Sequence, residues 1–264
     1  MKNDFYKYQA QTTPHPLALE VSHAKGCYIY DIKGKEYLDF IAGVSASSLG
    51  HCHPKVISAV KNQLDKYLHV MVYGEFIQEP AVELTKLLSG LLPDNLTTTY
   101  LTNSGTEAIE GSIKLARRAT GRKEIIYAKK AYHGNTMGAL SIMGVEERKE
   151  IFQPLLPDCN SIEFNNEKDI LKITSKTAGV VLETIQGGAG FIVPKNNYLK
   201  KIKNRCSDVG ALLILDEIQP GFGRTGKLFG FEHYDISPDI LAIGKGMGGG
   251  MPIGAFTASK KLMS

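Results

Sequence analysis

The feature that most constrains the fold is a series of short apolar runs separated by segments with helical spacing. Such a run is typical of a strand buried on both faces, and an intervening helix returns the chain so that successive strands run parallel. The pattern predicts an α/β fold, with a mostly parallel sheet that carries helices on both faces. The expected strands lie at 99–102, 124–128, 179–183, 211–215, 240–243 and 253–256, and the expected helices at 105–119, 145–152 and 196–209.

The residues before this pattern follow a different plan. A turn at Gly34 separates two aromatic-rich runs, which indicates a β-hairpin. Apolar side chains then recur at helical spacing over residues 55–67 and again over residues 79–92. We therefore expect an N-terminal segment, residues 1–75, with a hairpin and a helix. A larger domain over residues 76–264 follows it.

The composition argues against several classes of protein. A net charge of +4, with only short lysine pairs, argues against nucleic-acid binding. No apolar stretch approaches the length of a membrane span, and the four cysteines lack C-x-x-C spacing. His51-Cys52-His53 is interpreted as a turn before Pro54, so no metal is expected. We expect a soluble, cytoplasmic protein with no nucleic-acid or membrane partner.

A lysine and an aspartate end two of the expected strands. Lys245 stands among glycines after the run 240–243, and Asp216 follows the run 211–215. Burial lowers the pKa of a lysine, and only the neutral amine is a nucleophile. A pyridoxal phosphate site needs this pair, because the lysine forms a Schiff base and the aspartate holds a proton on the pyridine nitrogen.

The segment Ser104-Gly105-Thr106 opens an expected helix directly after a strand. The free N–H groups and the dipole of a helix N-terminus attract an anion, which indicates a phosphate site. The alternative is that Ser104 or Thr106 only caps the helix. Tyr132-His133 is less specific, since an aromatic residue before a polar turn often covers the edge of a core.

Two further segments carry polar side chains. Glu183 follows a buried run, where a structural ion pair is as good an interpretation as a catalytic role. The glycine-rich loop at 221–226 leads into no apolar helix, which argues against a dinucleotide site. Arg224 in this loop is expected to anchor it by ion pairing.

These motifs, in this order, resemble the class III aminotransferases, fold-type I pyridoxal phosphate enzymes that include acetylornithine, ornithine and 4-aminobutyrate aminotransferases. The resemblance runs from 34–40 to 248–254. It implies the large domain of that fold and gives Lys245 the Schiff base and Asp216 the pyridine nitrogen. The further cofactor-binding residues that we predict are Ser104, Gly105, Thr106, Tyr132, His133, Glu183, Ile218 and Gln219.

The resemblance also assigns roles within this set. Gly105 and Thr106 would bind the phosphate. Tyr132 would stack on the ring and Ile218 would pack against it, while Gln219 would reach the phenolic oxygen. The implied reaction is a ping-pong transfer of an amino group from an amine or amino acid to an oxo acid. The lysine would act as general base and then as general acid.

Three features depart from the pattern of these enzymes. Asn135 stands where they have an arginine that holds a substrate carboxylate, and Gly188 stands where they have a glutamate. We therefore expect that acetylornithine is not the substrate. The chain stops at Ser264, before the expected C-terminal small domain. The resemblance implies a homodimer for the full-length form, so we expect weak or no turnover from this chain alone.

Other interpretations remain open at this point. An aminomutase or racemase of the same fold shares the lysine and the aspartate but consumes no oxo acid. A non-catalytic fragment that binds the cofactor or a partner subunit is a third. A nicotinamide enzyme is a weaker fourth, because no G-x-G-x-x-G motif opens a helix near the start of the sheet.

Overall fold

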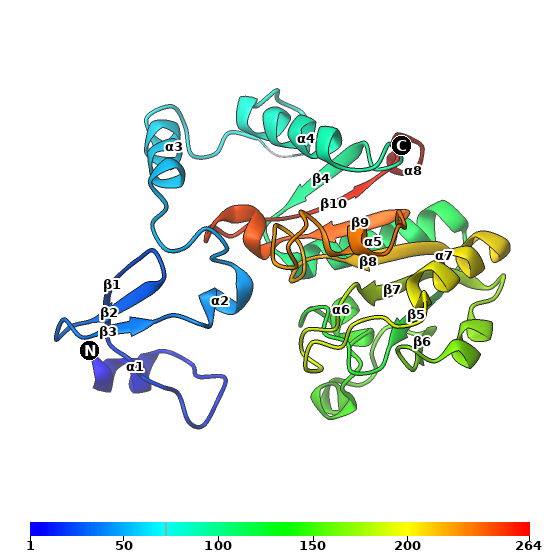
Figure 1. Ribbon diagram of the computed structural model, residues 1–264, viewed down its shortest axis with the longest axis horizontal. Coiled ribbons are helices and arrows are strands. Elements are labelled where there is room, and N and C mark those ends of the chain that lie inside the picture. Colours follow the sequence, from blue (N-terminus) through cyan, green and yellow to red (C-terminus); the bar gives the residue numbers. More distant parts are fainter. Residues whose placement is uncertain (72) are drawn as a thin grey trace.

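The computed structural model describes residues 1–71 and 73–264. Its largest element is a seven-stranded sheet, near the centre of Figure 1. The strands are β4 (Thr98–Thr102), β5 (Glu124–Ala128), β6 (Cys159–Ile162), β7 (Thr177–Glu183), β8 (Leu212–Asp216), β9 (Ile240–Ile243) and β10 (Gly254–Ala258). They lie in the order β4-β10-β9-β8-β7-β5-β6. Strands β5 to β9 are parallel, and β10 is antiparallel to both of its neighbours.

Helices cover both faces of this sheet, as the sequence predicts. Alternate residues of a strand point to opposite faces, so Val180 and Leu182 belong to one core cluster and Val181 to the other. The first cluster packs against α7 (Tyr198–Val209), and the second packs against α5 (Gly105–Thr120). Every residue of β7, β9 and β10 is buried. The α/β prediction is therefore confirmed.

Two details of the sheet domain differ from the sequence prediction. Strand β6 was not expected, because Cys-Asn-Ser-Ile has no apolar run and the strand is an edge strand with one buried residue. The expected helix at 145–152 is instead two short 3-10 helices, η1 (Glu146–Arg148) and η2 (Glu150–Phe152). The other elements here are α4 (Glu79–Leu91), α6 (Met137–Ser141), η3 (Glu167–Lys172), η4 (Gly230–His233), η5 (Lys245–Gly248) and α8 (Lys260–Met263).

The N-terminal segment lies to one side of the large sheet, in blue at the left of Figure 1. It contains α1 (Lys2–Tyr8), β1 (Val21–Lys25), β2 (Tyr28–Asp31), β3 (Glu36–Leu38), α2 (Ala42–Ser45) and α3 (Pro54–Leu64). The expected hairpin is present as β2 and β3, and β1 adds a third antiparallel strand that was not expected. None of the described residues before Leu88 is buried. The boundary at residue 75 stays a prediction.

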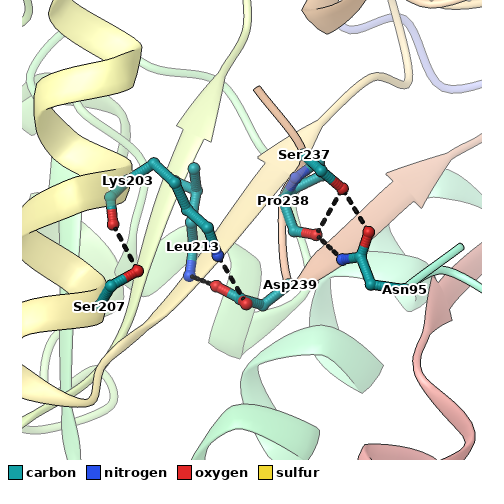
Figure 2. A network of polar contacts seen from close by, with 7 residues as sticks. All are labelled: Asn95, Lys203, Ser207, Leu213, Ser237, Pro238 and Asp239. Atoms are coloured by element: carbon teal, nitrogen blue, oxygen red, sulfur yellow. Dashed lines mark hydrogen bonds and ion pairs between the residues drawn. The ribbon is translucent and has the colours of Figure 1, made fainter. Parts of the chain in front are cut away.

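A polar network fixes the start of β9, the strand that leads to Lys245 (Figure 2). The Asp239 carboxylate accepts hydrogen bonds from the Leu213 backbone N–H at 2.8 Å and from the Lys203 ammonium at 2.7 Å. The Asn95 side-chain amide donates to the Pro238 carbonyl at 2.7 Å. The network thus ties β9 to β8, to α7 and to the loop before β4. None of the described helices is both long enough and apolar enough to cross a membrane.

Candidate active site

A cavity of about 840 Å³ opens where strands β5, β7, β8 and β9 end and helix α5 begins. Ligands of parallel α/β sheets bind at this edge, since the carboxyl ends of the strands converge there. Of the ten residues predicted for the site, nine line the cavity, and Ser104 does not. The lining residues are Val44, Gly105, Thr106, Tyr132, His133, Gly134, Asn135, Thr136, Glu183, Gly187, Gly188, Asp216, Ile218, Gln219, Pro220 and Lys245.

Asp216 is held by a buried histidine at the floor of this cavity. His133 Nδ1 donates to Asp216 Oδ2 at 2.8 Å, and the Ile218 backbone N–H donates to Oδ1 at 3.0 Å. Both side chains are almost completely buried. The other ring nitrogen of His133, Nε2, is buried without a hydrogen-bond partner in the described chain. A carboxylate that is buried and oriented in this way suits a cationic N–H group of a ligand.

Lys245 follows β9 after a single residue, Gly244, and begins the 3-10 helix η5. Its φ of 45° lies in the left-handed region, which a non-glycine residue keeps only where its surroundings impose it. The side chain is half-buried. Burial lowers the pKa of Lys245, while the carboxylates of Asp216 and Glu183 partly oppose that shift. The lysine therefore has the lowered pKa that a nucleophilic amine requires.

The Glu183 carboxylate organises two loops of the cavity wall. It accepts hydrogen bonds from the backbone N–H groups of Tyr132 and Gly187, both at 2.9 Å. Burial raises the pKa of Glu183, the positive field of His133 lowers it, and Asp216 raises it further. Because its oxygens are engaged by backbone N–H groups, the residue holds the wall in place as well as lining the cavity.

The start of α5 shows how its three predicted residues divide their roles. Ser104 caps the helix, since its hydroxyl accepts from the Glu107 backbone N–H at 3.3 Å and donates to the Glu107 carboxylate at 3.1 Å. Gly105 is packed against Ile218, and a Cβ atom at this glycine would lie 2.8 Å from Ile218 Cδ1. The first N–H groups of a helix have no partner inside it, so this end suits an anion. The assignment of Ser104 as a cofactor contact stays a prediction.

Threonines and a glutamine complete the cavity wall. The hydroxyls of Thr106 and Thr136 share a hydrogen bond of 2.8 Å. The Gln219 amide nitrogen lies 3.4 Å from the Ser45 hydroxyl, which joins the sheet domain to the N-terminal segment. A Cβ atom at Gly187 would overlap Gln219 Oε1, so a larger residue at this position would displace the Gln219 side chain.

Val44 is a wall residue that sequence reasoning did not identify. It lies in a run of four left-handed residues, 42–45, with φ values of 48°, 59°, 55° and 70°. Left-handed backbone costs about 1–2 kcal/mol for an ordinary residue, and β-branched valine is among the least suited to it. Asp39 holds the turn, because its carboxylate accepts from the N–H groups of Ile41 and Ala42, each at 2.9 Å. No periodic pattern in the sequence marks such a turn.

Glu217 is a second residue that sequence reasoning did not single out. It is fully buried next to Asp216 and accepts hydrogen bonds from the Thr184 hydroxyl and from the N–H groups of Gly230 and Phe231. Burial raises the pKa of Glu217 to about 7, although these three donors lower it. The carboxylate joins the ends of β7 and β8 to η4. From the sequence, Asp216 was assigned to the site and Glu217 was given no role.

Other predicted features lie outside this cavity. Arg224 makes no ion pair in the described residues, where its guanidinium donates to the Ser48 hydroxyl at 3.3 Å. The described residues contain no group of three or more His, Cys, Asp or Glu side chains suited to a metal ion. A second cavity of about 360 Å³ lies near Lys149, whose ammonium is paired with Glu146 and Tyr127. None of the predicted site residues lines it.

Comparison with known proteins decides the family. Residues 8–264 match the family model described as Aminotransferase class-III. The chain belongs to the class III aminotransferases. It is 43% identical to the acetylornithine aminotransferase of Clostridium acetobutylicum over 247 residues. The match covers 91% of this chain and 63% of that relative. It is 42% identical over 236 residues to a [LysW]-aminoadipate semialdehyde/glutamate semialdehyde transaminase of Sulfolobus acidocaldarius, with 89% and 60% covered.

Solved structures of transaminases share this class III fold. An ornithine aminotransferase from Toxoplasma gondii has a TM-score of 0.88 and 32% identity over all of this chain and 65% of its own. A second structure of that enzyme has partial occupancy of pyridoxal phosphate (PLP) at its active site. An (S)-enantioselective omega-transaminase from Thermomicrobium roseum has a TM-score of 0.90 and 29% identity over 99% of this chain and 66% of its own. The chain spans about 60–66% of the length of these relatives.

Proposed function

We propose that this chain is the pyridoxal phosphate-binding part of an aminotransferase that moves an amino group from an amine or amino acid to an oxo acid in a ping-pong reaction. The observation that carries the proposal is the convergence of Lys245 and the His133–Asp216 pair on one cavity. The family and its PLP-bearing structural relative support the same cofactor.

The residues present fit this cofactor on three observations of the cavity. The helix start at Gly105 and Thr106 suits the phosphate. The buried carboxylate of Asp216 suits a protonated pyridine nitrogen. The pKa of Lys245 is lowered by burial, as an amine that condenses with an aldehyde requires. Bound pyridoxal phosphate supplies that aldehyde and a ring that accepts the electron pair left on the donor carbon.

The chain's own residues then perform the proton transfers and the positioning. With the cofactor bound, the Lys245 amine would act as the general base that takes a proton from the donor carbon, and its ammonium form would then act as the general acid. The hydrogen bond from His133 keeps the Asp216 carboxylate oriented toward the cavity. Glu183 holds the loop that carries Tyr132 in place. Gln219 is placed on the same wall, where its amide offers a neutral donor.

We propose that the amino donor is not acetylornithine, although relatives of the chain are named acetylornithine aminotransferases. Asn135 and Gly188 line the cavity where the resemblance leads us to expect an arginine and, after the Gln-Gly pair, a glutamate. An asparagine cannot form the two parallel charged hydrogen bonds by which an arginine holds a carboxylate.

We further propose that the full-length protein is a cytoplasmic homodimer. The N-terminal segment exposes large apolar side chains, such as Leu17, Phe40 and Leu68, which a second subunit would cover. All four cysteines are free thiols, as in a reducing compartment. Light scattering on the full-length protein should give twice the subunit mass, and a monomer at micromolar concentration would contradict the proposal.

The test of the cofactor proposal compares the chain with its Lys245→Ala variant after addition of pyridoxal phosphate. We expect the parent chain to give a yellow complex that borohydride fixes covalently to the peptide containing Lys245, and the variant to give none. Consumption of an oxo acid by the full-length protein separates a transaminase from an isomerase of the same fold. Absence of the Lys245 adduct would contradict the proposed cofactor chemistry for this chain.

A further inference from the structure

A carboxylate behind the cavity wall holds the end of the 132–136 loop. Glu110 lies in the second turn of α5 and is not among the described residues that line the cavity. Its Oε1 atom accepts hydrogen bonds from the backbone N–H groups of Gly138 and Ala139, at 2.9 and 3.1 Å. These N–H groups belong to the first turn of α6, where a helix supplies no acceptor of its own. Glu110 therefore caps α6 from the neighbouring helix.

The same oxygen of Glu110 sets the direction of two further hydrogen bonds. The Thr136 hydroxyl donates to Oε1 at 2.5 Å, and this oxygen is an acceptor for the two N–H groups as well. A hydroxyl has a single proton, so Thr136 accepts in its 2.8 Å hydrogen bond with Thr106. The chain of hydrogen bonds thus runs from the Thr106 hydroxyl through Thr136 to Glu110.

Close packing accompanies this chain of hydrogen bonds. A Cβ atom at Gly134, whose φ is 128°, would overlap Thr106 Oγ1. A Cβ atom at Gly138 would overlap the Glu110 carboxylate. The loop backbone therefore lies directly against the two side chains of α5. The start of α5 and the 132–136 loop are fixed relative to each other by contacts that converge on Glu110.

We propose that Glu110 is a positioning residue for the phosphate of the cofactor, and that it acts on Thr106 through Thr136. Helix ends fray readily, and an anchored Thr106 keeps the first N–H groups of α5 in the orientation that an anion requires. The inference rests on the proposed pyridoxal phosphate function and adds a residue outside the cavity on which binding depends. An effect of charge alone would have the opposite sign, because a nearby carboxylate repels a phosphate.

The test measures the dissociation constants of pyridoxal phosphate and of pyridoxal, by titration of the visible absorbance of the yellow complex. Both aldehydes react with Lys245, so the ratio of the two constants isolates the contribution of the phosphate. The ratio does not depend on the fraction of chain that is folded. In Glu110→Ala we expect pyridoxal phosphate to bind about tenfold more weakly and pyridoxal to change by less than about twofold. An unchanged ratio, or tighter binding of pyridoxal phosphate, would overturn the inference.

Glu110→Gln separates the position of the acceptor from its charge. The glutamine side chain keeps an acceptor oxygen for Thr136 and for the N–H groups of α6 but is neutral. We expect both dissociation constants to stay within about threefold of those of the parent chain. A loss as large as that of Glu110→Ala would contradict a role of the acceptor. Glu83→Ala, at an exposed carboxylate of α4 outside the cavity, is the matched control and should change neither constant.

A double-mutant cycle tests the route through Thr136. Thr136→Val keeps the shape of the side chain and removes the hydroxyl that joins Glu110 to Thr106. In this background Glu110→Ala should weaken pyridoxal phosphate binding by less than about threefold, because the shared hydrogen bonds are already lost. A tenfold loss in both backgrounds would overturn this route.

The Lys245 adduct of the parent chain tests the proposed function separately. If the adduct forms and Glu110→Ala leaves the ratio of the two constants unchanged, the positioning role fails and the cofactor assignment stands. If no adduct forms, the cofactor assignment fails, and this inference fails with it.

Discussion

The seven-stranded sheet and the N-terminal segment contrast in how they are stabilised. All residues of β7 and β9 are buried, with α5 and α7 on opposite faces of the sheet. In the N-terminal segment no described residue is buried, and Phe40 is 90% exposed. The sheet therefore has its own core, whereas hairpins and turns without one are stabilised mainly by local hydrogen bonds.

This difference explains what each region contributes to the site. Asp216 and Glu183 end buried strands, and Lys245 lies two residues after the end of one, so their positions are fixed by the core. The N-terminal segment contributes Val44 through a turn held by the Asp39 carboxylate. The comparison indicates that the sheet positions Lys245, Asp216 and Glu183, and that the N-terminal segment completes one wall of the cavity.

The largest expected effect tests the contrast in burial with one substitution made in both regions. Leu182 in β7 is fully buried, whereas Leu17 in the N-terminal segment is 87% exposed. Leu182→Ala should lower the free energy of unfolding by about 2–5 kcal/mol, and Leu17→Ala by less than about 0.5 kcal/mol. Urea unfolding measures both. Similar losses in the two variants would show that the N-terminal segment has a core of its own.

A somewhat smaller effect concerns pH and Glu217. Because burial raises its pKa from 4.5 to about 7, the folded chain binds more protons than the unfolded chain between these values. Stability should therefore fall as the pH rises from about 4.5 to about 7, by at most about 3 kcal/mol from this residue. Glu217→Gln should flatten this slope while leaving the part due to Glu183, whose pKa is also raised. Equal slopes in urea unfolding of the two proteins would contradict the assignment.

The smallest expected effect concerns the network at the start of β9. Asp239→Ala removes the acceptor of the Leu213 N–H and should cost about 1–3 kcal/mol. Asp235→Ala is the matched control, because its fully solvated carboxylate pairs with Lys200 at 3.7 Å and should contribute little. Thermal unfolding compares the two variants. A larger loss for Asp235→Ala would show that the network does not hold β9 in place.

The sequence carried most of the sheet but less of the site. Buried parallel strands have apolar runs in the sequence, so β5, β7, β8 and β9 could be predicted. Because Lys245 and Asp216 lie at the ends of two of these strands, their position near one another could be predicted as well. Strand β6 could not, because an edge strand needs no apolar run. The left-handed turn at Val44 depends on contacts with residues such as Asp39, for which local sequence has no periodic signal.

The hydrogen bonds that orient the side chains of the site could not be predicted from the sequence either. The pairing of His133 with Asp216 joins residues far apart in the chain, and only the folded sheet brings them to 2.8 Å. The same applies to Glu217, whose donors come from β7's end and from η4. Polar residues at strand ends indicate where a site is, but their hydrogen-bond partners are set by tertiary structure.

Hydrogen–deuterium exchange of the chain, with and without pyridoxal phosphate, tests the central claim most directly. The account predicts slower exchange on cofactor addition at the cavity segments, namely residues 103–107, 132–136, 216–219 and 244–246. Exchange near Lys149, beside the second cavity, should not change. Protection confined to the Lys149 region, or absent from the segments at the strand ends, would contradict the assignment of the cavity as the cofactor site.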